Sequence, residues 1–180
     1  AAAVAVNFFE RLLTHSKGEW AGQAFKLQDW QREQIIKPLF GWKRTDGTRK
    51  FRTAYIEIPR KNGKSTLAAG IALFLVYADG EPGAQVFSAA ADREQASIVF
   101  DEAKNMVQAS PQLAKRSEVY KRSIVLPSTV STYRVLSADA FSKHGLNAHG
   151  VVVDELHAQP TRELVDVLVT STGARRQPLV

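Results

Sequence analysis

The fold of this chain is decided by Pro59-Arg60-Lys61-Asn62-Gly63-Lys64-Ser65, which stands between a predicted strand over 51–58 and a predicted helix over 65–78. A turn from a strand into a helix presents backbone N–H groups and a helix N-terminus to phosphate oxygens. Gly63 would let the backbone approach closely, Lys64 would reach the β- and γ-phosphates, and the Ser65 hydroxyl would bind Mg²⁺. The segment therefore predicts a phosphate-binding loop, with an ordinary strand–helix turn as the alternative.

An acidic pair follows a run of valines later in the chain, in Val151-Val152-Val153-Asp154-Glu155. Such a run is typical of a strand buried on both faces, and ligands bind at the carboxyl ends of strands in open α/β sheets. Asp154 would hold hydrated Mg²⁺, and Glu155 would polarise an attacking water. The alternative is a helix cap followed by a first-turn acid. Together with the phosphate loop, the pair predicts a Mg²⁺-dependent ATPase.

The rest of the chain alternates predicted strands and helices. This order indicates an α/β fold, a P-loop NTPase of the ASCE type with a mostly parallel central sheet flanked by helices, in one domain over 1–180. The other predicted strands cover 84–89, 123–126, 133–136 and 150–153, with a further one starting at 177–180. The other predicted helices cover 8–13, a stretch from Asp29 until Pro38 disturbs it, 92–108 and 161–170.

Composition narrows the class of protein. The 24 Lys and Arg against 18 Asp and Glu give a formal charge of +6, which suits a polyanion such as nucleic acid or a solubilising basic surface. The absence of Cys excludes disulfides and thiolate metal sites and favours a reducing compartment. The longest apolar run, 67–78, is broken by Gly70 and is too short to span a bilayer, so we expect no membrane partner. Residues 1–6 lack the basic start of a signal peptide.

Two further groups of residues carry weaker predictions. Three histidines lie near the acidic pair, but their spacing matches no zinc pattern and favours loop histidines: His144, His149 and His157. No motif supports Ser-His-Asp catalysis. A basic stretch could contact DNA phosphates or form a solvated loop: Lys115, Arg116, Lys121 and Arg122.

With these motifs the chain resembles the N-terminal ATPase domain of the large terminase subunit of tailed bacteriophages, particularly the HK97-type branch. Terminases have a deviant phosphate loop with an early Arg and without the first Gly, as Arg60 and Ile58 show. Their acidic motif is a hydrophobic run that ends in Asp-Glu, as in 151–155. The segments 25–31, 40–42, 91–96 and 145–147 are also similar to this branch.

The resemblance implies roles for individual residues. Gln31 would contact the adenine, with a solvent-facing helix residue as the alternative. Arg60 would contact the γ-phosphate as a fork of donors, with a surface Arg as the alternative. We expect ATP to be bound by Gln31, Arg60, Lys61, Asn62, Gly63, Lys64, Ser65 and Thr66. We expect Mg²⁺ at Ser65 and Asp154, and catalysis by Glu155, Lys64, Arg60 and Lys143.

Lys143 is included among the catalytic candidates because other terminases place a trans-acting Arg shortly before the acidic motif. This chain has Ser142-Lys143-His144-Gly145 there, so Lys143 is the nearest permanent cation and would act as a point charge on a neighbour's phosphates. Other candidates are His144, Arg134, Arg175 and Arg176, and Lys143 facing solvent remains an alternative.

The resemblance also implies partners and context. We expect a motor that drives double-stranded viral DNA into a procapsid, as a homo-oligomeric ring with the portal protein and the small terminase subunit. It would work in the host cell cytoplasm, transiently docked on the procapsid. The coupling motif and the nuclease domain would lie beyond Val180, so the chain is expected to be a fragment. The alternatives are a helicase-type DNA translocase and a non-hydrolysing nucleotide- or DNA-binding module.

Overall fold

A computed structural model describes residues 1–180 except 60, 91–92, 137–144 and 157–162. Its centre is a five-stranded sheet in the order β2-β3-β4-β1-β5. The strands are β1 (Gln85–Ala89), β2 (Glu118–Val119), β3 (Ser123–Leu126), β4 (Ser131–Val135) and β5 (Gly150–Val153). β1 pairs in parallel with both β4 and β5, whereas β2, β3 and β4 form an antiparallel edge. The predicted α/β class is confirmed, with a parallel core beside an antiparallel meander.

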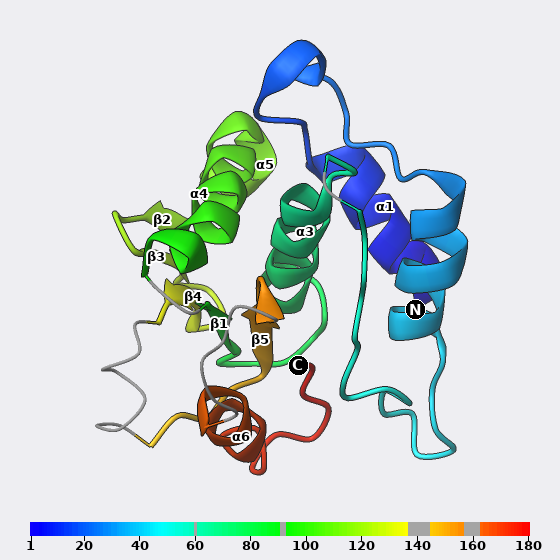
Figure 1. Ribbon diagram of the computed structural model, residues 1–180, viewed down its shortest axis with the longest axis vertical. Coiled ribbons are helices and arrows are strands. Elements are labelled where there is room, and N and C mark those ends of the chain that lie inside the picture. Colours follow the sequence, from blue (N-terminus) through cyan, green and yellow to red (C-terminus); the bar gives the residue numbers. More distant parts are fainter. Residues whose placement is uncertain (60, 91–92, 137–144, 157–162) are drawn as a thin grey trace.

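Helices cover both faces of this sheet (Figure 1). The α-helices of the described structure are α1 (Ala2–Leu12), α2 (Lys37–Gly41), α3 (Lys64–Tyr77), α4 (Arg93–Ala109), α5 (Pro111–Ala114) and α6 (Glu163–Thr170). α3 and α4 bury one face, where Val86 of β1 belongs to the main core. Leu168 of α6 packs with Phe87, Ala89 and Val151 on the other face. Alternate β1 side chains therefore enter different cores, as the period of a strand requires.

Two glycines bring α3 close to its neighbours. A Cβ at Gly70 would lie 2.3 Å from a ring atom of Phe9, and a Cβ at Gly150 would lie 2.6 Å from Leu75. Only a residue without a side chain lets α1 and the start of β5 approach α3 this closely. The packing holds α3 at a set position against the sheet, and the first residue of α3 is Lys64.

The expected strand over 51–58 was wrong. The segment is extended, and two hydrogen bonds connect it with Val180. The Val180 N–H donates to Arg52 O, and the Ala54 N–H donates to Val180 O, both at 2.9 Å. Leu179 in turn forms a parallel bridge with Gly150 of β5. Residues 179–180 thus lie between β5 and 51–58. Among the described residues, the segment makes these two hydrogen bonds to Val180 and is extended without the repeated hydrogen bonds of a regular ladder.

The expected end of the second helix at Pro38 was also wrong. A π-helical stretch, η2 (Gln31–Ile36), runs directly into α2, and Pro38 lies in the first turn of α2. Proline lacks an N–H and its ring clashes with the carbonyl four residues earlier in a regular α-helix. The wider π turn displaces that carbonyl, so the chain stays helical as far as Gly41. Among the described residues, none of the helices is long and apolar enough to cross a membrane.

Candidate functional site

The loop before α3 has the backbone geometry of an anion-binding turn. Gly63 adopts a left-handed conformation (φ 72°) directly before Lys64, the first residue of α3, and Lys61 also has a positive φ of 66°. No side chain caps this N-terminus by a hydrogen bond. A helix N-terminus offers N–H groups and a partial positive charge to a ligand. The turn is suited to bind phosphate oxygens.

The acidic pair lies at the carboxyl end of β5. Asp154 is almost fully buried, its N–H donates to Ala89 O of the neighbouring strand (3.1 Å), and its Oδ1 accepts the N–H of Glu155 (3.0 Å). Glu155 has a φ of 51°, a conformation that costs energy for a residue with a side chain. These contacts hold the Asp154 carboxylate at the sheet edge and turn Glu155 away from the strand direction.

The two motifs meet through Lys64. Its Nζ lies 3.2 Å from Asp154 Oδ1 and forms an ion pair with the Glu155 carboxylate. The hydrogen bond that Lys64 donates to Glu155 raises the pKa of Lys64, partial burial opposes this rise, and Asp154 adds to it. The lysine is therefore held in its charged form, and both carboxylates lie within reach of whatever the lysine binds. The sequence did not predict this direct contact.

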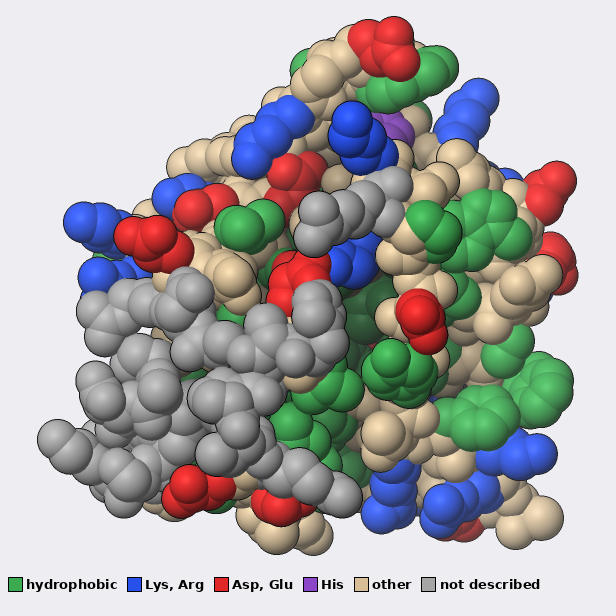
Figure 2. All heavy atoms as spheres, in the orientation of Figure 1, with side chains coloured by type: hydrophobic (Ala, Val, Ile, Leu, Met, Phe, Trp, Pro, Cys, Tyr) green, Lys and Arg blue, Asp and Glu red, His purple; other side chains and the backbone are tan. Residues whose placement is uncertain are grey.

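A cleft of about 510 Å³ opens beside these residues. Residues 53–58 form one wall, β5 forms the other, and Lys64, Asp154 and Glu155 line one end. Most of its lining is apolar, including Leu67, Ile71 and Val152. Figure 2 shows a hollow in this face, with an acidic and a basic side chain at its rim and apolar atoms below them. The polar end is where a charged ligand would gain most, because water is partly excluded there.

The remaining predicted nucleotide residues are distributed as follows. Ser65 and Thr66 lie half-buried in the first turn of α3, Asn62 Nδ2 donates to Pro59 O (3.3 Å), and Lys61 is exposed. Gln31 is 3% exposed, and its Oε1 accepts the N–H of Gln28 (3.0 Å). The solvent-facing alternative for Gln31 is therefore wrong, and its contact with adenine stays a prediction. Arg60 and Lys143 lie outside the described residues, so their roles also stay predictions.

The structure also places most of the histidines and basic residues for which the sequence carried weaker predictions. His149 lies in the bend directly before β5, as predicted for a loop histidine, but its side chain is fully buried; His144 and His157 lie outside the described residues. In the part of the chain that the structure describes, no group of three His, Asp or Glu could hold a metal by itself. Arg175 donates to the carbonyls of Asn147 (3.2 Å) and Gly83 (2.7 Å), and its role as a candidate trans-acting cation stays a prediction. The basic stretch is exposed: Lys115, Arg116, Lys121 and Arg122.

Comparisons with known proteins agree with this geometry. The family model "Terminase large subunit, ATPase domain" matches residues 29–180. The chain is 34% identical to the terminase large subunit of Enterobacteria phage HK97, over 97% of this chain and 34% of that protein. It is similar to the crystal structure of the HK97 bacteriophage large terminase, with a TM-score of 0.82, 30% identity, and coverage of 99% of this chain and 36% of that one.

The fold also matches a more distant relative. The large terminase ATPase domain of Thermus phage P74-26 has a TM-score of 0.58 and 21% identity, over 82% of this chain and 67% of that chain. The chain spans about a third of the length of the HK97 proteins that it matches.

Proposed function

The chain belongs to the family of terminase large-subunit ATPase domains, and we propose that it is the motor domain of a viral DNA-packaging enzyme. In this proposal it hydrolyses ATP with Mg²⁺ and uses the free energy to drive double-stranded DNA into a procapsid. The observation that carries the proposal is the meeting of Lys64 with Asp154 and Glu155 at the carboxyl edge of the sheet.

This arrangement suits phosphoryl transfer, in which enzymes supply positioning and charge stabilisation rather than covalent chemistry. Lys64 would bind the β- and γ-phosphates, and the N–H groups at the start of α3 would bind the remaining oxygens. Glu155, released from Lys64, would orient the attacking water and accept its proton. The Asp154 N–H is bonded to Ala89 O, so the backbone of Asp154 would keep its place while the Glu155 side chain moves.

The residues present also fit a magnesium ion. The Ser65 hydroxyl and the Asp154 carboxylate are hard oxygen donors, and Mg²⁺ in such sites takes one or two carboxylates and completes its shell with phosphates and water. When bound, the ion would neutralise charge on the β- and γ-phosphates. The single buried carboxylate at the end of β5 is enough for this role, which agrees with the lack of a larger acidic cluster among the described residues.

A surface rich in exposed Lys and Arg side chains supports the proposal that the chain binds DNA. Residues 42–50 form a hairpin closed by a bridge between Lys43 and Arg49, and Arg52 Nη2 donates to Arg176 O next to it. Figure 1 places this hairpin at the lower right, and Figure 2 shows Lys and Arg side chains gathered there. The exposed cations of this surface are Lys43, Arg44, Lys50, Arg52 and Arg176. Such a surface suits a phosphate backbone.

We extend the proposal to the assembly. A homo-oligomeric ring would dock transiently on the procapsid in the host cell cytoplasm, with the portal protein and the small terminase subunit as partners. A Lys143 side chain from one subunit would then act on the phosphates bound by its neighbour. A helicase-type translocase is not favoured, because the terminase family model covers 29–180.

Two assays test the proposal. Phosphate release from ATP should depend on Mg²⁺ and disappear in Glu155→Gln, whereas a non-hydrolysing binding module would release no phosphate in either form. DNA affinity should fall steeply with salt, and Lys50→Ala should reduce the salt slope by about one unit, as expected for one lost phosphate contact. DNA binding that is independent of salt would contradict the DNA role without affecting the ATPase assignment.

A further inference from the structure

A basic surface lies along one edge of the sheet, around β2 and β3. Five exposed side chains, the edge cations, form it: Lys115, Arg116, Lys121, Arg122 and Arg134. The described stretch 115–135 holds these five Lys and Arg against one acid, Glu118, a formal charge of +4 in a chain whose total is +6. Most of the surplus positive charge therefore lies at this edge, where the fields of neighbouring like charges add.

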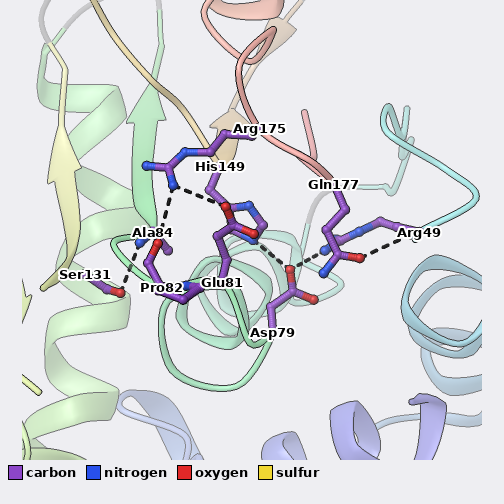
Figure 3. A network of polar contacts seen from close by, with 9 residues as sticks. All are labelled: Arg49, Asp79, Glu81, Pro82, Ala84, Ser131, His149, Arg175 and Gln177. Atoms are coloured by element: carbon purple, nitrogen blue, oxygen red, sulfur yellow. Dashed lines mark hydrogen bonds and ion pairs between the residues drawn. The ribbon is translucent and has the colours of Figure 1, made fainter. Parts of the chain in front are cut away.

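The edge cations are not neutralised by acids of the chain. Among the described residues, none of the five forms an ion pair. Elsewhere, cations that are largely buried face acids, and Figure 3 shows Arg49 beside Asp79 and Arg175 beside Glu81. The charge of the edge cations is therefore available to a partner from outside the chain.

The backbone that carries Lys115 and Arg116 is fixed to the core. These two residues follow α5, whose Leu113 is fully buried. The Arg116 N–H donates to Leu113 O (3.1 Å), and the Ser117 hydroxyl donates to the same oxygen (2.6 Å). Ser117 also shares a hydrogen bond with the Tyr77 hydroxyl at the end of α3. The backbone is therefore held here, although the two basic side chains reach into solvent.

The other edge cations stand on a closed turn and on the strand beside it. The Tyr120 N–H donates to Ser123 O (2.8 Å), which closes the turn between β2 and β3 around Lys121 and Arg122. Arg134 of β4 stands opposite Ser123 in the ladder. Because a surface on fixed backbone loses less conformational freedom when a ligand docks, this arrangement favours binding.

Protection of the sheet edge does not account for these charges. Charged residues on an edge strand prevent its pairing with another chain. β2 is an edge strand, but it covers two residues, Glu118–Val119, and none of the edge cations lies in it. Arg134 lies in β4, which has a strand on each side. The edge cations therefore exceed what this short edge requires.

The spacing of the edge cations suits a continuous row of negative charges. Arg116 and Lys121 are joined by so short a piece of chain that at most about 18 Å separates them. Double-stranded DNA carries one charge per about 1.7 Å of its axis, or about ten phosphates over that length. Protein interfaces instead have an apolar centre, and within 115–126 Tyr120 is the exposed large hydrophobic side chain. A phosphate backbone therefore fits this surface better than an acidic protein does.

We propose that the edge cations bind the phosphate backbone of double-stranded DNA, as a contact surface separate from the hairpin 42–50. Figure 1 places β2 and β3 at the left of the view and this hairpin at the lower right. The inference rests on the proposed function, which supplies DNA as the partner. Phosphate contacts position a duplex without reading its bases, so the surface binds DNA of any sequence.

Salt-dependent binding of a fluorescent duplex tests this surface. In Lys121→Ala with Arg122→Ala, the plot of log affinity against log salt should lose about two units of slope, one for each phosphate contact. The matched control is Arg11→Ala with Lys26→Ala, which removes two exposed cations elsewhere and should keep the parent slope. Both double variants lower the net charge equally and should release phosphate from ATP like the parent. Two duplexes of unrelated sequence should give the same slopes.

Equal slopes in the two double variants would overturn the inference, because net charge alone would then explain the binding. It would also fail if the parent self-associates without DNA while the Lys121→Ala, Arg122→Ala variant stays monomeric and keeps the parent slope. The surface would then join copies of the chain. A slope that falls in Lys50→Ala but not in Lys121→Ala, Arg122→Ala would count against the inference alone. A parent without salt-dependent DNA binding would contradict the DNA role in the proposed function as well.

Discussion

Lys64, the first residue of α3, forms an ion pair with Glu155, two residues beyond β5, although 91 positions separate them in the sequence. The carboxylate that we propose to orient the attacking water is therefore paired with the lysine that we propose to bind phosphate. ATP would have to displace Glu155 from Lys64, which would free the carboxylate only when a triphosphate is bound. This relationship is the basis of the first two predictions.

Lys64→Ala should weaken ATP binding about 10- to 100-fold, since a hydrogen bond to a charged group contributes about 1.5–3 kcal/mol. The measurement is a titration with a fluorescent ATP analogue. Lys37→Ala, which removes an exposed lysine paired with Glu33, is the control and should bind like the parent. Equal affinities in the two variants would remove Lys64 from the nucleotide site.

Glu155→Gln should slow hydrolysis about 10²- to 10⁴-fold, the usual contribution of a positioned base. Its ATP affinity should equal or exceed that of the parent, because the variant no longer competes with phosphate for Lys64. Single-turnover phosphate release and equilibrium binding measure the two effects. Weaker ATP binding in this variant would show that the ion pair does not oppose the nucleotide.

Removal of Mg²⁺ with EDTA should abolish phosphate release and leave the fold intact. Asp154→Asn should raise the Mg²⁺ concentration needed for half-maximal hydrolysis about tenfold or more, a common effect of altering a carboxylate that supports a metal. Ser65→Ala should act in the same direction. If Asp154→Asn changes kcat at saturating Mg²⁺ but not the Mg²⁺ dependence, the metal role belongs to another residue.

Gly70→Ala should destabilise the protein by about 1–3 kcal/mol, because the new methyl group would lie 2.3 Å from the Phe9 ring in a dense core. This cost exceeds the gain of about 1 kcal/mol that alanine brings to a helix interior. Urea unfolding measures the difference. Gly145→Ala, where no atom lies within 4 Å of the added Cβ, is the control and should change stability by less than about 0.5 kcal/mol.

His15 should contribute to loss of stability in acid. Its ring packs edge-on against the Phe25 ring, with 4.9 Å between the ring centroids. Burial lowers the pKa of His15 from its ordinary value of 6.5, and the nearby Glu102 carboxylate opposes this shift. Glu102 Oε2 also lies 3.8 Å from Lys17 Nζ. Protonation of His15 therefore favours the unfolded chain, so its contribution is present above pH 6.5 and is lost as the pH falls through the lowered value. Urea unfolding of His15→Gln should show a shallower decline than the parent below pH 6.5. Parallel declines would contradict it.

The chemical motifs were visible in the sequence because each is local. A Gly-Lys-Ser at a helix start, and two acids after a run of valines, specify backbone conformation and chemistry within a few residues. The α/β class followed from the alternation of short strands and helices, and the apolar composition of α3 predicted its buried position. The terminase resemblance used the same local features, and the family comparisons confirm it.

Features that depend on a distant partner were not predicted. The segment 51–58 has the residues of a strand, but in the described structure it is extended and bonded to Val180 rather than part of a regular ladder, and the sequence does not show which residues lie beside it. The π-helical stretch before Pro38 also escaped prediction, because the sequence shows the proline but not how the preceding turn accommodates it.

What the sequence by itself determined is the set of groups predicted for one end of the sheet, a lysine and two carboxylates, because each of them belongs to a local motif. Only the tertiary structure decided that Lys64 forms an ion pair with Glu155, and that the buried Asp79 carboxylate contacts both Arg49 and His149. The physical reason is that ion pairs and burial depend on separations in space. Packing of α3 against β5 sets the separation of Lys64 from Glu155 across 91 positions of the chain.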